Sequence, residues 1–196
     1  MLHFGPQELI WECADETSCE CAGIEVTQPK PEYARVLQEG SVKQIKDMWH
    51  RLVILYTDLE LTFDYDRLPA LAGLAKRFKD YRHGKYLAGL WEDTLVEDLL
   101  WHTDFPYARP EKWRAPTWSW ASVDGGASYL YVRDSVQALC KVLGFQGTPL
   151  GPDSFGELSS ANITLAGLTA PMDHHGDSSE NSFDSEIHQF FVTKPG

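Results

Sequence analysis

The clearest hydrophobic pattern of the chain lies at residues 42–57, where apolar side chains recur at every third or fourth position. This spacing places them on one face of an α-helix. Ser41 and Gln44 stand where a capping box would begin: the serine side chain accepts from the N3 amide, and the glutamine reaches back to the N-cap amide. The pattern therefore predicts a helix over residues 42–57.

A second helical pattern follows Asp66, which we expect to be the N-cap. Pro69 falls in the first turn, where its missing N–H costs nothing. Small residues in this stretch, Gly73 among them, suit close packing against a neighbouring element. The predicted apolar stripe consists of Leu68, Leu71, Ala72, Ala75 and Phe78.

A third helix is predicted over residues 85–102. With Leu90 in support, one i+4 row of this stretch carries Leu87, Trp91, Leu95 and Leu99. A helix cannot wrap a cation as a loop does, so calcium binding is disfavoured here. We instead expect a solvated face made by Glu92, Asp93, Glu97 and Asp98.

Beyond Pro106 and Pro110 the pattern changes to alternation, which is typical of strands. Residues 116–123 (PTWSWASV) predict a strand with Trp118, Trp120 and Ser122 on one face, ended by Gly125 and Gly126. Further strands are expected at 128–134, 136–145 and 161–170, with a glycine- and proline-rich separator at 144–157. A last strand is expected at 188–193.

The two ends of the chain read differently from its centre. Residues 2–12 suggest a β-hairpin around Gly5 and Pro6, and the strand pattern begins without a polar lead-in, so we expect upstream sequence to be missing. The fold class is α+β: an N-terminal β-hairpin, a three-helix segment and an antiparallel β-rich C-terminal region. The expected parts are a hairpin (1–13), an acidic loop or linker (14–40), a helical segment (41–104), a β-rich region (105–170) and a polar, mobile tail (171–196).

Composition narrows the function classes. The 196 residues carry a formal net charge of −12, from 29 acidic and 17 basic side chains, which disfavours nucleic acid and anionic membranes as partners. No run of about 18 apolar residues exists, and no signal peptide begins the chain. Four cysteines without a signal peptide indicate free thiols in a reducing compartment, so we expect a cytoplasmic protein.

The sequence predicts no catalytic, cofactor-binding or metal site. Zinc needs paired ligands at constrained spacing, and the candidates match this poorly: Cys13, Cys19, Cys21, Cys140, His174 and His175. No hydrolase, nucleotide-binding or metalloprotease motif occurs. Ser119 and Ser122 have no histidine placed to activate them, and Cys140 lies in an apolar strand. We expect an N-cap with a nearby ion pair at Asp64, Asp66 and Arg67, and isolated histidines at His3, His50, His83 and His102.

Four blocks in order carry a resemblance: LHFGPQELIWEC, DRLPALAGLA, YLAGLWEDTLVEDLLW and APTWSWASVDG. Over residues 2–126 they resemble the later part of fungal heterokaryon-incompatibility (HET domain) proteins. The residues that carry the resemblance, which we expect to be structural, are Trp11, Asp66, Arg67, Leu68, Pro69, Gly73, Gly89, Leu90, Trp91, Trp101, Pro116, Trp118, Ser119, Trp120, Ala121 and Ser122.

The resemblance implies a part in non-self recognition between fungal strains and in programmed cell death when incompatible strains fuse. In that family the HET domain lies mostly upstream of these blocks, and it has been likened to Toll/interleukin-1 receptor-like domains, some of which cleave NAD. The first hypothesis is a non-catalytic accessory or regulatory region that packs on, displays or restrains a HET domain in cis or in trans.

Two alternatives stay open: a nucleotide-cleaving enzyme, and a binding module with an exposed aromatic platform. A platform requires solvent-facing rings, whereas a core role requires buried ones. We expect Trp118 and Trp120 to pack against the helices of residues 68–100, with their indole N–H groups bonded to backbone carbonyls.

Overall fold

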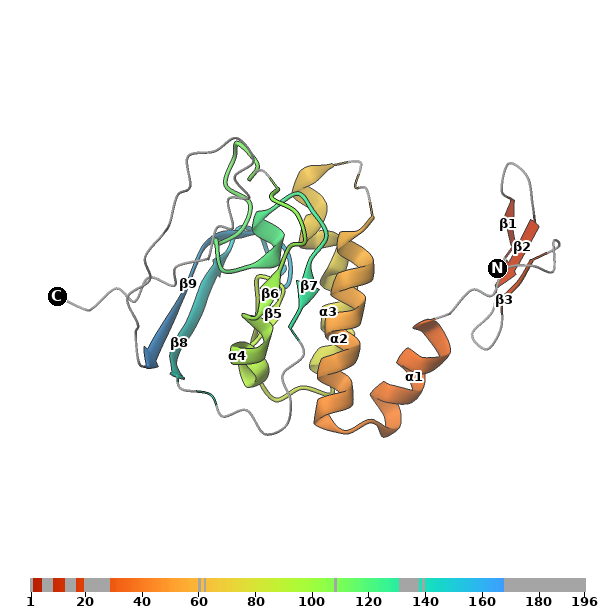
Figure 1. Ribbon diagram of the computed structural model, residues 1–196, viewed down its shortest axis with the longest axis horizontal. Coiled ribbons are helices and arrows are strands. Elements are labelled where there is room, and N and C mark those ends of the chain that lie inside the picture. The colour runs from red at the N-terminus through yellow and green to blue at the C-terminus, as the bar shows by residue number, and fades with distance from the viewer. Residues whose placement is uncertain are drawn as a thin grey trace, which may run out of the picture. The chain divides into compact units, whose positions relative to one another are not determined.

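The computed structural model of the chain falls into two compact units, Met1–Trp49 and His50–Gly196. Within the described residues, four α-helices and small antiparallel strand pairs make an α+β fold, as predicted (Figure 1). Side chains are described from residue 32 onward. The described residues are 2–4, 9–12, 17–19, 29–59, 61, 63–107, 109–130, 138 and 140–167.

The first unit begins with a three-stranded antiparallel sheet in the order β1-β2-β3. Its middle strand pairs Trp11 with Leu2 on one side and with Ser18 on the other. The turn expected at Gly5 and Pro6 lies outside the described residues. The strands are β1 (Leu2–Phe4), β2 (Leu9–Glu12) and β3 (Thr17–Cys19).

The prediction of an irregular linker over residues 14–40 was wrong, because β3 and helix α1 (Pro29–Glu39) fall inside it. Prolines at 29 and 31 favour a linker when the sequence is considered alone, because proline breaks the interior of a helix. They instead occupy the first turn, where a missing N–H has no partner within the helix to lose. Val36 and Leu37 supply the buried face of α1, each 4% exposed.

Helix α2 (Val42–Thr57) begins and ends where the hydrophobic pattern predicted. The capping box is also confirmed. The Gln44 amide donates to Ser41 Oγ at 3.3 Å, and the Ser41 amide donates to Gln44 Oε1 at 2.9 Å. This helix start is therefore fixed by its own local sequence.

The second unit contains helix α3 (Pro69–Lys79), preceded by the 3₁₀ turn η1 (Asp64–Arg67). The whole predicted stripe, from Leu68 to Phe78, is buried. Asp66 is not the N-cap, however, since it lies inside η1, and Leu68 takes that position without a side-chain bond. Pro69 at the first helical position sets where α3 begins, and the four residues of η1 form a separate turn before it.

The third predicted helix, over residues 85–102, was wrong. Ala88 and Gly89 both have positive φ, 52° and 89°, which suits a two-residue hairpin turn and ends any helix. The apolar row is buried nonetheless, but it comes from two short strands and a one-turn helix rather than from one long helix. The elements present are β4 (Tyr86–Leu87), β5 (Leu90–Trp91), η2 (Glu92–Thr94), α4 (Leu95–Asp98) and β6 (Trp101–His102).

The strand predicted at residues 116–123 was also wrong. The Ser119 amide donates to the Pro116 carbonyl at 2.9 Å and the chain then enters the 3₁₀ turn η3 (Trp120–Ser122). Ser119 Oγ caps this turn by accepting from the Ala121 amide at 3.0 Å. The alternation of large and small side chains therefore reflects a loop buried on all sides.

The unit continues with β7 (Ser128–Tyr129), which pairs with β6, and with a long hairpin of β8 (Cys140–Pro149) and β9 (Leu158–Gly167). In Figure 1 this hairpin lies on one side of the short strands β5–β7, and α3 lies on the other. The predicted separator at 144–157 was too long, because β8 extends to Pro149.

The rest of the C-terminal predictions concern undescribed residues. Most of the strand expected at 128–134, the tail at 171–196 and its strand at 188–193 lie outside the described part of the chain. In the part that is described, no helix has the length and apolar character needed to cross a membrane.

Candidate functional site

Three of the four resemblance blocks meet at Trp120, a completely buried side chain. Its indole Nε1 donates to the carbonyl of Gly89 at 3.2 Å, in the turn between β4 and β5. The neighbouring Ser119 Oγ donates to the carbonyl of Ala88, at 2.6 Å, in the same turn. We call residues 118–125 the tryptophan loop. Two adjacent side chains of this loop thus bind both residues of the β4–β5 turn.

Gly89 allows the Trp120 indole to lie against its backbone for two reasons. Its φ of 89° is unfavourable for a residue with a side chain, and an added Cβ would lie 2.5–2.6 Å from atoms of the Trp120 indole. A second tryptophan ties the loop from the other side, because Trp101 Nε1 donates to the carbonyl of Trp118 at 2.8 Å. The predicted indole-to-carbonyl bond is therefore confirmed for Trp120, with a turn rather than a helix as its partner.

Arg67 connects a further block to this point. Its guanidinium Nη2 donates to the carbonyl of Gly125, and its Cζ lies 5.9 Å from the centre of the Trp120 ring. Burial lowers the pKa of Arg67, and the positive charge of Arg114 lowers it further. Tyr56 of α2 donates its hydroxyl to the Arg67 carbonyl at 2.8 Å and packs edge-on against Trp120.

Arg114 holds the outer side of the same loop. Its side chain donates to the carbonyl of Ala121 at 2.7 Å and to that of Val123 at 2.9 Å. It also pairs with the carboxylate of Asp124 at 2.7 Å and donates to the carbonyl of Asp64 at 3.0 Å. Two buried arginines thus donate hydrogen bonds to backbone carbonyls of a loop that has no strand partner over most of its length.

We call this assembly of Arg67, Ala88, Gly89, Trp101, Arg114 and residues 118–125 the junction. Other residues of the resemblance contribute core packing: Leu68, Leu90, Trp91, Pro116, Ala121 and Ser122 are buried. Asp66 and Gly73 are exposed, Pro69 is half-buried, and the side chain of Trp11 lies outside the described set. The junction is held together by hydrogen bonds to backbone carbonyls and by the packing of aromatic rings. These contacts are structural.

A second buried polar cluster was not predicted. The Asp98 side chain is 1% exposed, although we expected a carboxylate that faces water. It accepts three hydrogen bonds: from the Trp91 amide at 2.7 Å, from Thr94 Oγ1 at 2.9 Å and from His50 Nε2 at 2.7 Å. A buried carboxylate requires such partners, because an unpaired charge away from water is strongly unfavourable.

Arg82 and Tyr129 complete this cluster. Arg82 forms a two-pronged ion pair with Asp93, at 3.0 and 2.7 Å, and donates to Thr94 Oγ1. The Tyr129 ring stacks on the His50 ring with centres 3.8 Å apart. Burial raises the pKa of the Tyr129 hydroxyl, and the charge of Asp98 raises it further, so this group stays neutral.

A histidine paired with a carboxylate is a common acid–base arrangement in enzymes. Here one face of the His50 ring is covered by Tyr129, and 13% of the side chain is exposed. In the described part of the chain, no serine hydroxyl or cysteine thiol is bonded to this imidazole. The cluster joins α2, α4 and β7, and the hydroxyl in it that lies nearest to the Asp98 carboxylate is that of Thr94.

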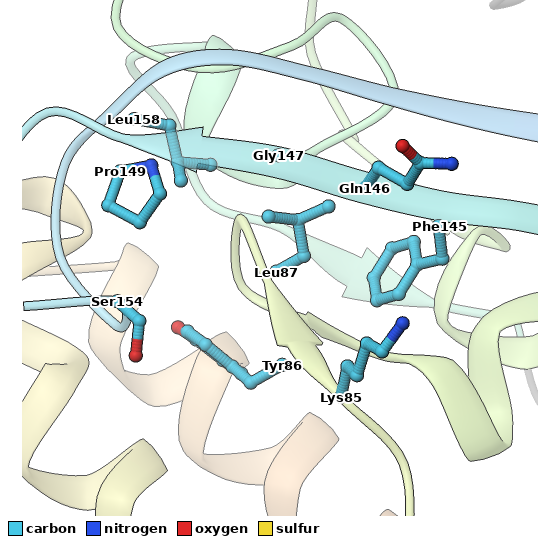
Figure 2. A pocket seen from close by; sticks show the side chains of 9 residues that line it. All are labelled: Lys85, Tyr86, Leu87, Phe145, Gln146, Gly147, Pro149, Ser154 and Leu158. Atoms are coloured by element: carbon cyan, nitrogen blue, oxygen red, sulfur yellow. The ribbon is translucent and has the colours of Figure 1, made fainter.

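A pocket of about 350 Å³ lies between β4 and the β8–β9 hairpin (Figure 2). In the figure Leu87 and Phe145 stand near its centre, and the Tyr86 hydroxyl lies toward Ser154. Its lining residues are Lys85, Tyr86, Leu87, Phe145, Gln146, Gly147, Pro149, Ser154 and Leu158. Neither His50 nor any junction residue belongs to this lining, so the pocket and the two buried clusters are separate.

The described part of the chain contains no group of three or more histidine, cysteine or acidic residues able to hold a metal ion. Cys140 is a free, half-exposed thiol at the start of β8. Cys13, Cys21, His174 and His175 lie outside the described residues, as does the side chain of Cys19.

Sequence reasoning missed the roles of His50, Arg82, Asp98 and Arg114. One signal was available: a threonine and an aspartate at 94 and 98, inside a strongly apolar stretch, are placed to bond each other over one turn. The partners of Asp98 and Arg114 in distant segments leave no such local signal.

Comparison of the chain with protein-family models, with curated proteins and with solved structures gave no match.

Proposed function

We propose that this chain is a non-catalytic accessory region of a HET-domain-like protein, acting in fungal non-self recognition and the cell death that follows it. In this proposal it binds a HET domain, in cis or in trans, in the cytoplasm. The family assignment rests on the four ordered sequence blocks. The non-catalytic role rests on where three of those blocks lie.

The junction is the observation that carries the proposal. If the shared residues formed an active site, their polar groups would converge on a space open to a ligand. Instead Arg67 Nη2, Ser119 Oγ and Trp120 Nε1 each donate to a backbone carbonyl of the chain itself. These contacts favour a structural role for the three residues over a catalytic one.

The aromatic-platform alternative fits the tryptophan loop poorly. Trp118 and Trp120 are 9% and 0% exposed, so their faces cannot stack on a sugar or peptide. The enzyme alternative has one observation in its favour, the 2.7 Å contact between His50 and Asp98. The His50 side chain is therefore the group to remove when turnover is tested.

Incubation of the purified chain with NAD should give no cleavage, because no serine hydroxyl or cysteine thiol of the described residues is bonded to the His50 imidazole. Product is measured by chromatography against a buffer blank. The matched variant is His50→Ala, checked for folding by circular dichroism. Reproducible cleavage by the parent chain that disappears in folded His50→Ala protein would contradict the non-catalytic role and establish the enzyme alternative.

A further inference from the structure

We propose that an exposed aromatic surface next to the junction is the docking site for a partner segment that presents arginine or lysine side chains among apolar residues. The surface is defined by four rings: Phe63, Tyr65, Tyr107 and Trp113. The proposal rests on the partner-binding role given above and gives that role a place on the molecule.

These rings are exposed to an unusual extent for aromatic side chains. Phe63 is 66% exposed, Trp113 51%, Tyr65 43% and Tyr107 40%. Single exposed apolar residues need no explanation, whereas a group of aromatic ones marks an interaction surface. Tyrosine, tryptophan and phenylalanine are also the residues enriched in the centres of protein interfaces.

Contacts link the segments that carry these rings to one another. The Lys112 ammonium lies 5.7 Å from the centre of the Tyr65 ring, and Arg114 donates to the carbonyl of Asp64 at 3.0 Å, so residues 112–114 run beside residues 63–65. Tyr107 lies directly on Gly125, where an added Cβ would be 2.1–2.3 Å from its ring atoms.

The base beneath the rings is fixed before any partner arrives. Arg114 lies next to Trp113 and is bonded to the carbonyls of Ala121 and Val123 and to the carboxylate of Asp124. Arg67 binds the Gly125 carbonyl, on which Tyr107 rests. A surface held in this way loses little conformational freedom on binding, which favours affinity.

Charge identifies the kind of partner. Exposed carboxylates lie in or beside the segments that carry the rings, at Asp58, Asp64 and Asp66, and the whole chain carries a net charge of −12. Aromatic faces attract ammonium and guanidinium groups, and Lys112 already occupies such a position over Tyr65. Acidic edges and cation-binding rings together fit a basic, partly apolar protein segment and disfavour nucleic acid or an anionic membrane.

The test uses the full chain and a short fluorescein-labelled peptide of alternating arginine and leucine, with fluorescence anisotropy as the readout. We expect Trp113→Ala to weaken binding about tenfold, as truncation of a central interface aromatic does. Leu143→Ala is the matched control, because Leu143 is a 65% exposed apolar side chain on β8. It should bind as tightly as the parent chain.

Two further comparisons separate docking from general attraction of a cation to an acidic protein. A peptide with glutamate in place of arginine should bind at least about tenfold more weakly, and the paired change Asp64→Asn with Asp66→Asn should weaken binding of the arginine peptide. Four results would each overturn the proposal: no binding, equal affinity for both peptides, equal loss in the Trp113 and Leu143 variants, or occupation of the rings by a second copy of the chain. Binding of a HET domain that survives Trp113→Ala would remove this surface while leaving the proposed function intact.

Discussion

Replacement of Trp120 by alanine is expected to lower the free energy of unfolding by about 3–5 kcal/mol, the usual cost of truncating a buried tryptophan. The ring is fully buried, packs edge-on against Tyr56 and has the Arg67 guanidinium over it. Truncation would also leave the Gly89 carbonyl without its indole donor. Urea denaturation followed by circular dichroism measures the change.

Three further variants, one at a second tryptophan and two at glycines, test whether the loss of stability is specific to the junction. Trp113→Ala, at a 51% exposed site, should change stability by no more than about 0.5 kcal/mol. Gly89→Ala should be strongly destabilising, since its Cβ would strike the Trp120 ring, whereas Gly73→Ala has open space and a helix interior that favours alanine. A Trp120→Ala chain as stable as the Trp113→Ala chain would refute the junction as the centre of the fold.

Replacement of Asp98 by alanine is the second large effect, again about 3–5 kcal/mol. The change removes the acceptor of the buried Trp91 amide and Thr94 hydroxyl and the partner of the half-buried His50 imidazole. The two buried donors would then lose their bonds without gaining water. The same denaturation assay measures the loss.

The control for Asp98 is its neighbour Glu97, a half-exposed acid in the same short helix α4. Glu97→Ala should stay within about 0.5 kcal/mol of the parent chain. If Asp98→Ala and Glu97→Ala lowered stability by the same small amount, Asp98 would behave as the solvated acid that the hydrophobic pattern suggested, and the network would carry no weight.

The predictions that held were those that local sequence decides. Helix α2 was found from its capping box and its periodicity, which need no information beyond adjacent turns. The buried stripe of α3 was found in the same way. In both helices the propensity, the pattern and the packing agree, which is where sequence reasoning is strongest.

The predictions that failed depended on distant partners or on special backbone angles. Residues 85–102 mimic a helical row, but the positive φ angles at Ala88 and Gly89 turn the chain into a hairpin. Asp98 was placed in water because its acceptor bond from His50 spans 48 residues. The bond from Arg67 to Gly125 spans 58 residues, so the junction could not be read from any one block.

The buried junction also explains the different places of the three tryptophans that fall within eight positions. Trp118 and Trp120 belong to the interior, whereas Trp113 lies on the surface five residues earlier. Between them, Arg114 fixes the loop to the core. The same segment thus anchors the fold at one end and presents an exposed ring at the other.

Isothermal titration of this chain with a HET domain taken from a longer fungal HET protein tests whether the chain binds such a domain. We expect a saturable one-to-one complex with a Kd of about a micromolar or tighter, equivalent to about −8 kcal/mol. An unrelated acidic domain of similar size should release no binding heat in the same cell. Absence of binding by a folded chain, with a HET domain that is itself folded, would contradict the accessory role.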